Sequence, residues 1–368
     1  MAHEFLAWEH LLLQNRVNNM ERRVQKREWR DNHDPFELSD DMFINLYRVS
    51  PEIAMDLIDI LEPRLQRQRI DGLSTEHQVL TALRFYAVGC YQRAIGEQWD
   101  IAVSQPTVSR CVRAVTNAIN DVLLRHWVRF PMTDIERFAA KEKFRTAPQP
   151  FMGAIGAIDC THISILAPRQ HEEAYVNHWG DHTLNVQAIC DPELKILNVN
   201  ARYPGARHDA YVWSNSPVRR IMERRYNNGE RNTWLIGDDG YGLEPWLFTP
   251  LKHEIPGSPR YQYNEDLCNA RSCVERLFGV WKAVFRCLSA QRQLMYEPDI
   301  AGKIVNACAV LHNMRIAHRL QDIEVDEQEI LHHIQMNDRA VRQNEALPGR
   351  AIAIRIQDNF IARQYGRM

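Results

Sequence analysis

The chain has 368 residues, of which 45% are hydrophobic and 25% charged, and its formal net charge is -2. This length can bury a sizeable core and favours two domains, and the composition is typical of a soluble globular protein. No apolar run reaches the roughly 18 residues of a membrane helix, and the N-terminus lacks a signal-peptide cleavage site, so we expect an intracellular protein without membrane spans. The eight cysteines include no C-x-x-C pair, which indicates neither a disulfide framework nor a zinc ribbon.

Two charged segments stand out in a chain whose overall charge does not indicate a nucleic-acid binder. Residues 16–30 form a basic arm with a helical pattern, and residues 321–329 are acidic. Charge runs of this kind are commonly solvated helix faces. The sequence leaves open whether the basic arm binds DNA or protein.

Residues 1–130 are predicted to form an all-α domain. Ser50 suits a helix N-cap, Pro51 suits a first helical position, and apolar residues recur three and four positions apart. A further helix is expected at about 75–88.

Two helices near the end of this domain, a short one at 91–98 and a longer one from near Gln105, form a candidate helix-turn-helix at about 91–124. In such a motif the start of the second helix enters the major groove of DNA. Here that end offers polar and basic side chains, namely Ser104, Gln105, Thr107, Ser109, Arg110 and Arg113. The alternative is a helical hairpin that only packs.

The hydrophobic pattern changes from helix to strand after residues 131–150, which contain prolines and which we interpret as a linker. Beyond them, strand patterns, including a hairpin around Asp191-Pro192, are followed by amphipathic helices. This order predicts an α/β domain with a central mixed sheet over residues 151–320, followed by a C-terminal tail at 321–368.

Three carboxylates on three predicted elements could converge in this second domain. Asp159 lies within the strand pattern GAIDCTHISI, Asp238 directly follows the strand WLIG, and Glu275 lies on a helix. A carboxylate in a buried strand is costly unless it is paired or binds a cation, and Mg²⁺ prefers oxygen ligands. Asp159 is therefore predicted to hold metal, and two such ions would suit phosphodiester hydrolysis or transfer. Taken alone, each acid is more often a helix cap or a salt-bridge partner.

Arg271 and Lys282 share a helical face with Glu275, because they lie four residues before it and seven residues after it. These two cations could hold DNA phosphates beside a metal-binding Glu275. A salt-bridge ladder on the protein surface explains the spacing equally well.

Several ordered blocks carry a resemblance to a known family over roughly residues 40–319. They read GAIDCTHISILAP, NVQAICD, PGARHDAYVWSNS, LIGDDGYGLEPWLFTP, RSCVERLFGVWKAVFRCL and ACAVLHN. Together these blocks resemble the PIF/Harbinger transposase family. The resemblance implies an RNase H-like catalytic core, a DDE triad at Asp159, Asp238 and Glu275, and a divalent cofactor, Mg²⁺ or Mn²⁺, with two ions expected.

Three further residues could assist the triad, and the resemblance bears on the first two of them. Asp239 stands at the serine position of the family's G-D-S-G-Y block and is a fallback for Asp238. Asp209 matches an H-D pair of the family and could support metal or DNA from the third strand, although a helix N-cap role fits equally well. His162 could touch the phosphate, although packing is the more common role of such a histidine.

The leading function is a metal-dependent DNA endonuclease, either an active transposase or a transposase-derived host nuclease. The alternative is a DNA-binding adaptor protein that retains the triad without using it. The resemblance also implies DNA as a partner, a separate Myb/SANT-like protein as a second partner, and a nuclear location with a cytoplasmic pool. A homodimer is expected by analogy, because transposition joins two element ends. A zinc hydrolase fits poorly, since the 15 histidines show no H-E-x-x-H spacing.

Overall fold

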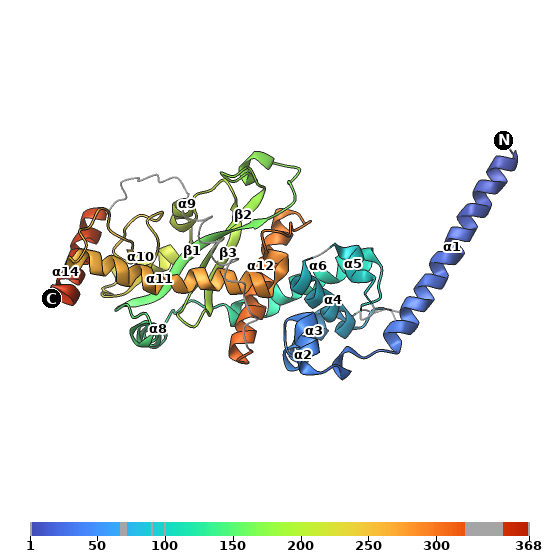
Figure 1. Cartoon of the computed structure of the whole chain (residues 1–368), viewed down its shortest axis with the longest axis horizontal. Helices are drawn as coiled ribbons and strands as arrows, with labels where there is room; N and C mark the ends of the chain where they lie inside the picture. The colour runs from blue at the N-terminus through green and yellow to red at the C-terminus, as the bar shows by residue number, and fades with distance from the viewer. Residues whose placement is uncertain (1, 67–71, 90, 99–100, 321–348, 367–368) are drawn as a thin grey trace. The chain divides into compact units, whose positions relative to one another are not determined.

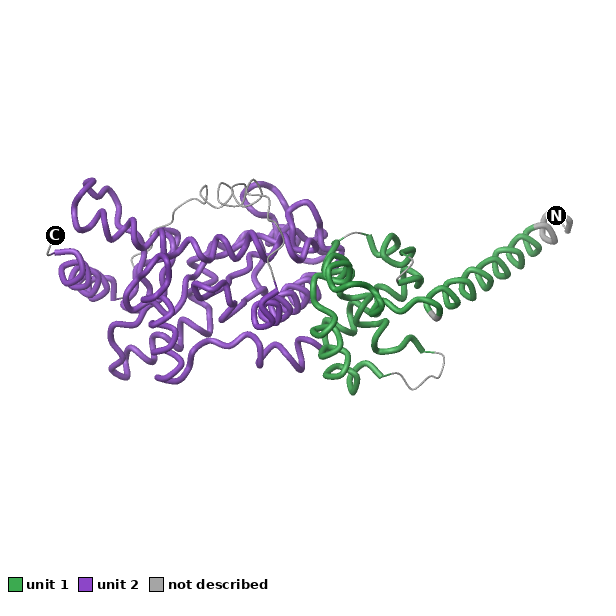
Figure 2. Tube along the Cα trace, turned by 60° about the horizontal axis from the view of Figure 1, so that its bottom comes forward, with its two compact units in different colours: residues 1–118 green, residues 119–368 purple. Residues whose placement is uncertain are grey.

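The computed structural model describes residues 2–66, 72–89, 91–98, 101–320 and 349–366. The chain divides into two compact units, residues 1–118 and 119–368 (Figure 2). Among the described helices, none combines the length and the apolar character that a membrane crossing requires. The first part of the predicted tail, 321–348, and with it the acidic segment, lies outside the described residues.

The described part of the first unit consists of helices and loops, as the apolar spacing predicts. Its helices are α1 (Ala2–Asp31), α2 (Asp40–Tyr47), α3 (Pro51–Leu65), α4 (Thr75–Val88), α5 (Gln92–Gly96) and the start of α6 (Gln105–Val122), with a 3-10 turn at Pro35–Glu37. Helix α3 begins as predicted, because the Ser50 hydroxyl accepts a hydrogen bond from the Ile53 amide at 3.3 Å and Pro51 needs no bond there. The predicted helices at 75–88 and from Gln105 are also confirmed.

The end of α1 is attached to the loop that joins α5 to α6. The Lys26 ammonium donates to the carbonyl oxygens of Gly96 and Val103 at 2.9 and 3.1 Å, and Arg30 donates to the Ala102 carbonyl at 3.0 Å. A Cβ atom at Gly96 would lie 2.5 Å from the Val103 carbonyl oxygen, so this close approach requires glycine. The first unit therefore holds α1 by its C-terminal turns.

The second unit is built around a five-stranded mixed sheet in the order β3-β2-β1-β4-β5. Figure 1 labels β1, β2 and β3 of this sheet. Its strands are β1 (Ala154–Ser164), β2 (Thr183–Cys190), β3 (Ile196–Pro204), β4 (Trp234–Ile236) and β5 (Leu247–Phe248). Strand β2 pairs antiparallel with both β1 and β3, whereas β4 runs parallel to both β1 and β5. The predicted mixed sheet and its hairpin are confirmed.

Helix α8 (Asp134–Thr146) occupies most of the segment that we interpreted as a linker, and it follows the short helix α7 (Leu124–Trp127). A capping box begins α8, with Thr133 and Glu136 each accepting a hydrogen bond from the other's backbone amide. The helix packs against β1. This segment is therefore part of the second unit's fold.

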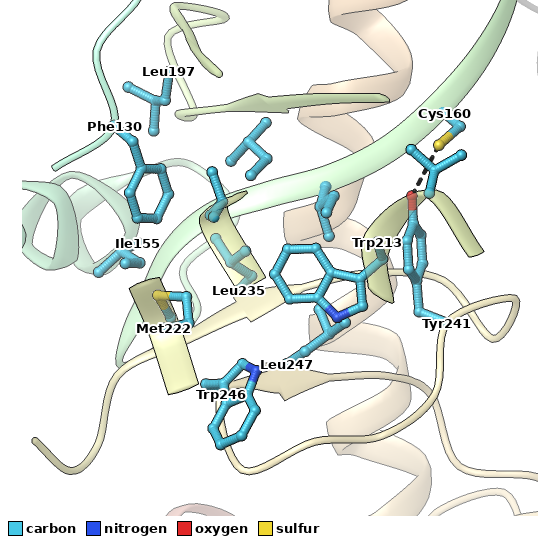
Figure 3. Close-up of a cluster of buried hydrophobic side chains, with 14 residues drawn as sticks. Phe130, Ile155, Cys160, Leu197, Trp213, Met222, Leu235, Tyr241, Trp246 and Leu247 are labelled. Atoms are coloured by element: carbon cyan, nitrogen blue, oxygen red, sulfur yellow. Dashed lines mark hydrogen bonds between the residues drawn. The ribbon is translucent and has the colours of Figure 1, made fainter. Parts of the chain in front are cut away.

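Helices cover both faces of the sheet. On one face, α9 (Asp209–Ser214) and α10 (Pro217–Asn227) contribute to the apolar cluster of Figure 3. That cluster consists of Phe130, Ile155, Ile158, Cys160, Ile189, Leu197, Val212, Trp213, Val218, Met222, Leu235, Tyr241, Trp246 and Leu247. Burial of these side chains is the main stabilising contribution to this side of the unit.

The other face of the sheet carries two long helices. Helix α11 (Pro259–Val284) packs on β1 and β2, and α12 (Pro298–Ala317) packs on β3. Because alternate side chains of a strand point to opposite faces, Asp159 points toward α11 while Ile158 joins the apolar cluster. The sheet thus presents the predicted catalytic strand directly to the helix that carries Glu275.

Helix α14 (Arg350–Tyr365), in the predicted tail, packs against α11. Its Gln357 side chain is buried and donates hydrogen bonds to the Thr249 carbonyl at 2.9 Å and the Tyr263 hydroxyl at 2.7 Å. Phe360 contacts the rings of Trp234 and Tyr263. This part of the tail is a structural element of the second unit.

Candidate active site

Asp159 is the most buried of the three predicted catalytic acids. It lies in the central strand β1 with 3% of its surface exposed. One carboxylate oxygen accepts the Cys160 amide at 2.8 Å, and the other accepts Nη1 of Arg271 at 3.0 Å. A backbone donor and a guanidinium together compensate for the burial of the carboxylate.

Arg271 connects two of the acids, because its second terminal nitrogen is hydrogen-bonded to Glu275, one helical turn further along α11. Burial disfavours the charged guanidinium, but the carboxylates of Asp159, Glu275 and Asp238 outweigh burial and raise the pKa of Arg271. The arginine is therefore a fixed positive charge among all three acids.

Asp238 follows β4, the strand that pairs with β1, and its Oδ1 accepts the Gly240 amide at 3.1 Å. Burial raises the pKa of Asp238 to about 6; Asp209 adds to the increase and Arg271 opposes it. Burial also raises the pKa of Asp159 well above its usual value, against the effect of Arg271 and with contributions from Asp238 and Asp209. These carboxylates lie close enough to repel one another.

Asp209 is the first residue of α9, and His208 occupies the N-cap position. Both structural expectations for Asp209 were therefore wrong, because it lies neither on the third strand nor at the cap itself. Its carboxylate accepts a hydrogen bond from Nδ2 of Asn185 on β2 at 2.8 Å. Burial raises the pKa of Asp209, although the bond to Asn185 opposes the increase.

Two neighbours of the acids were missed by the sequence analysis. Asn185 holds Asp209, and the Tyr241 hydroxyl lies 3.3 Å from the Cys160 sulfur beside Asp159 (Figure 3). Tyr241 belongs to the same GDDGY block as Asp238, so its proximity in sequence was an available signal. Asn185 carried no comparable signal, because its partner lies 24 residues further along the chain.

Lys282 and His162 are packed inside the second unit. Lys282 is 3% exposed and donates to the Thr161 hydroxyl at 2.7 Å and the His162 carbonyl at 3.1 Å; burial lowers the pKa of Lys282 to about 7. This burial argues against the predicted contact of Lys282 with DNA phosphates. Burial likewise lowers the pKa of His162 to about 3, and its Nδ1 pairs with the Thr183 hydroxyl at 2.8 Å, which favours packing over phosphate binding.

The donors around Arg271 suit a hard divalent cation. Asp159, Asp238 and Glu275 are oxygen donors, and a divalent charge would relieve the repulsion between Asp159 and Asp238. In the part of the chain that the structure describes, no three His, Cys, Asp or Glu side chains are already placed to hold a metal. The guanidinium of Arg271 supplies the positive charge instead.

The predicted DNA-contacting side chains of the first unit gather at the start of α6. The Ser104 hydroxyl lies 2.9 Å from that of Thr107, which accepts a hydrogen bond from Arg110 at 3.0 Å. Gln105 donates to Gln92 of α5 at 2.9 Å, and Arg110 and Arg113 are exposed. Polar groups on an exposed helix start are available for contacts with DNA.

Comparison with known proteins shows extended similarity. A family model described as "DDE superfamily endonuclease" matches residues 158–313, a stretch that contains Asp159, Asp238 and Glu275. The human protein "Putative nuclease HARBI1" is 33% identical over 287 residues, which are 77% of this chain and 79% of the human one. The Xenopus laevis protein of the same name is 31% identical over 323 residues, 84% of this chain and 90% of that protein.

The similarity extends to plants. "Protein ALP1-like" of Arabidopsis thaliana is 26% identical over 281 residues, 73% of this chain and 66% of that protein. No solved structure matches the chain. Because the animal relatives match over most of their length at more than 30% identity, the resemblance seen in the sequence blocks is confirmed, and the chain belongs to the Harbinger transposase-derived family of DDE superfamily endonucleases.

Proposed function

We propose that this protein is a divalent-metal-dependent DNA endonuclease of the DDE type, either a transposase or a host nuclease derived from one. The observation that carries the proposal is the pairing of Asp159 and Glu275, from two separate elements, with the guanidinium of Arg271, whose pKa Asp238 also raises. The sheet order β3-β2-β1-β4-β5 is consistent with an RNase H-like core.

Asp159, Asp238 and Glu275 would hold two divalent metal ions, either Mg²⁺ or Mn²⁺. When bound, such a pair activates a water molecule and stabilises the leaving oxygen of a phosphodiester. The chain's own part is positioning: the Cys160 amide orients Asp159, and Arg271 keeps Asp159 and Glu275 together. Asp209 adds negative charge near Asp159 and Asp238, which favours cation binding.

DNA would be held by the candidate helix-turn-helix, with α6 as the recognition helix. Its support is the exposed group of polar and basic side chains at the start of α6. A Myb/SANT-like partner protein and a nuclear location with a cytoplasmic pool belong to the same proposal. They rest on the family resemblance.

A second candidate function is supported by Arg271 itself. Arg271 already forms ion pairs with Asp159 and Glu275, so these two carboxylates are partly compensated without metal. This arrangement fits an adaptor protein that binds DNA through its first unit and cuts nothing.

The deciding measurement is DNA nicking by the full chain in Mg²⁺, Mn²⁺, Ca²⁺ or EDTA, with and without the Myb/SANT-like partner. Nuclease function predicts cleavage in Mg²⁺ or Mn²⁺ that falls by about a hundredfold or more in Asp159→Asn, Asp238→Asn and Glu275→Gln. Asp239→Asn is the matched control, since it removes the adjacent carboxylate and should cleave normally. DNA binding without nicking under every condition would establish the adaptor function instead.

A further inference from the structure

Helix α1 presents an exposed apolar stripe. Leu13, Val17, Met20 and Val24 follow one another at intervals of four, three and four residues, so they lie on one side of a continuous 30-residue helix (Figure 1). Their exposed fractions are 57, 54, 65 and 55%. This spacing is typical of the seam of a two-stranded coiled coil.

The residue types along the seam match one kind of coiled coil. In the heptad notation abcdefg, Val17 and Val24 occupy a positions, and Leu13 and Met20 occupy d positions. Branched side chains at a, combined with an unbranched or leucine side chain at d, favour a parallel dimer. The next d position is Arg27, so the apolar seam ends at Val24.

The charged residues beside the seam fit a second, parallel copy of α1. Arg16 and Arg23 fall at g positions, and Glu21 and Glu28 fall at e positions. In a parallel pair of helices, each g residue faces the e residue five positions further along the partner. Two copies of α1 would thus pair Arg16 with Glu21 and Arg23 with Glu28, on both sides of the seam. An antiparallel pair would place g beside g and e beside e, which opposes like charges.

These four charges lack an opposite charge within their own helix. No acidic residue lies three or four positions from Arg16 or Arg23, and no basic residue lies three or four positions from Glu21 or Glu28. A second helix in the stated register supplies all of these missing partners. We therefore propose that α1 forms a parallel, two-stranded coiled coil with α1 of a second copy of this chain.

The contacts that α1 makes within its own unit leave this seam accessible. Lys26, which bonds to the loop between α5 and α6, occupies a c position, outside the a and d rows. Trp8, Leu11 and Leu12 are also exposed and lie at f, b and c positions, so they do not form part of the interface. The seam is short, so we expect a weak dimer that dissociates on dilution.

The test is sedimentation velocity of the full chain at several concentrations with four sequences. The natural chain should show a concentration-dependent dimer. The double variants Arg16→Glu/Arg23→Glu and Glu21→Arg/Glu28→Arg should each be monomeric, because like charges meet at every g and e pair. An equimolar mixture of the two should dimerise again, because each g residue of one then faces its opposite on the other.

The quadruple variant with all four substitutions is the matched control. It has the composition and net charge of the natural chain with the signs exchanged across the interface, so it should dimerise like the natural chain. Helix content measured by circular dichroism at high concentration should be the same in the natural chain, the quadruple variant and the mixture of the two double variants. A Val17→Cys chain should form a disulfide dimer under mild oxidation far faster than an Arg22→Cys chain, because equivalent a positions of a parallel pair meet, whereas the f position of Arg22 faces away from the partner.

Three outcomes would overturn the proposal. The natural chain could remain monomeric at high concentration, or the two double variants could dimerise as well as the natural chain. Alternatively, the mixture of double variants could stay monomeric, which would refute the pairing and its register. Loss of DNA binding in Arg16→Glu/Arg23→Glu without any change in association would assign the basic arm to DNA.

Discussion

At the residue scale, Arg271 supplies the positive charge that compensates the buried carboxylates. It forms ion pairs with Asp159 and Glu275 at a site where its own side chain is 15% exposed. Removing one partner from a buried ion pair is expensive, because the remaining charges keep their desolvation cost without compensation. The same helix contains Arg260, which contacts Glu254 and Asp358 while 45% exposed.

We expect Arg271→Ala to lower the unfolding free energy of the metal-free protein by about 3 kcal/mol. The matched variant Arg260→Ala should cost less than about 1 kcal/mol, because its ion pairs are solvated. Added Mn²⁺ should raise the melting temperature of Arg271→Ala more than that of the natural chain, since the metal replaces a missing charge. Thermal unfolding in EDTA and in Mn²⁺ measures both effects, and an equal response to Mn²⁺ in the two chains would contradict the metal-binding role of the acids.

The raised pKa of Asp238 predicts that the stability of the metal-free protein depends on pH. Its folded pKa of about 6 is above its ordinary value of 3.8, so folding favours the protonated form. The unfolding free energy should therefore fall as the pH rises from about 4 to about 6, and this contribution should level off above that range.

Asp238→Asn removes this contribution and should stabilise the metal-free protein at pH 7.5 by about 1 to 2 kcal/mol. Urea unfolding in EDTA at several pH values should show a smaller slope in the variant than in the natural chain. Part of the slope should remain, because burial also raises the pKa values of Asp159 and Asp209. An unchanged slope would show that Asp238 is not buried among these acids.

The acids illustrate what the sequence can and cannot predict about a site. Asp159 was visible because a carboxylate conflicts with a strand made of apolar residues. The bond between Asp159 and Arg271 was not visible, because it joins residues 112 positions apart and depends on how α11 lies on the sheet. The spacing of Arg271 and Glu275 was read correctly as a shared helix face, yet it revealed only half of the arginine's contacts.

At the element scale, strands and helices with strong periodicity were predicted well, and α14 was not. Its sequence AIAIRI alternates with a period of two, which favours a strand. In the structure, Ala353, Gln357, Ile361 and Tyr365 are buried at intervals of four residues, so burial of this face, in a helix packed on α11, overrides the local pattern. The short strand β5 was also missed, because two residues carry no periodicity.

Gln357 tests the contribution of α14 to stability. Gln357→Leu should lower the unfolding free energy by about 1 to 3 kcal/mol, because the buried Tyr263 hydroxyl loses the donor that Gln357 supplies and the Thr249 carbonyl keeps only the Tyr263 hydroxyl as a donor. Gln364→Leu, at an exposed position of the same helix, is the control and should be nearly neutral. Equal stability of both variants in urea unfolding would mean that α14 does not dock as described.

Substitutions on helix α6 are predicted to weaken DNA binding whether or not metal is present. Arg110→Ala/Arg113→Ala should weaken DNA binding in EDTA and reduce the slope of log affinity against log salt by about two, if both residues contact phosphates. Arg64→Ala, exposed on α3, should change neither quantity. Fluorescence anisotropy over a salt series gives both values, and an unchanged slope in the double variant would exclude phosphate contacts by these arginines.

At the scale of the whole molecule, the proposed DNA-recognition and cleavage sites belong to different units. The candidate DNA-binding side chains belong to residues 1–118, and the acids belong to residues 119–368. The domain order was predicted from the change in periodicity. The packing of α8, within residues 131–150, on β1 was not predicted, because a capped helix with prolines on both sides resembles a linker in sequence.

The attachment of Lys26 and Arg30 to the loop before α6 has a consequence for the choice of DNA sequence. If two α1 helices pair in parallel, a twofold rotation axis relates the two copies of the first unit, and symmetric readers select symmetric sites. Binding sites selected from random DNA by the natural chain should then be inverted repeats. The Arg16→Glu/Arg23→Glu chain should select single half-sites of the same sequence, and the attachment of each first unit to the end of its α1 should appear in the natural sites as a fixed spacing between the two halves.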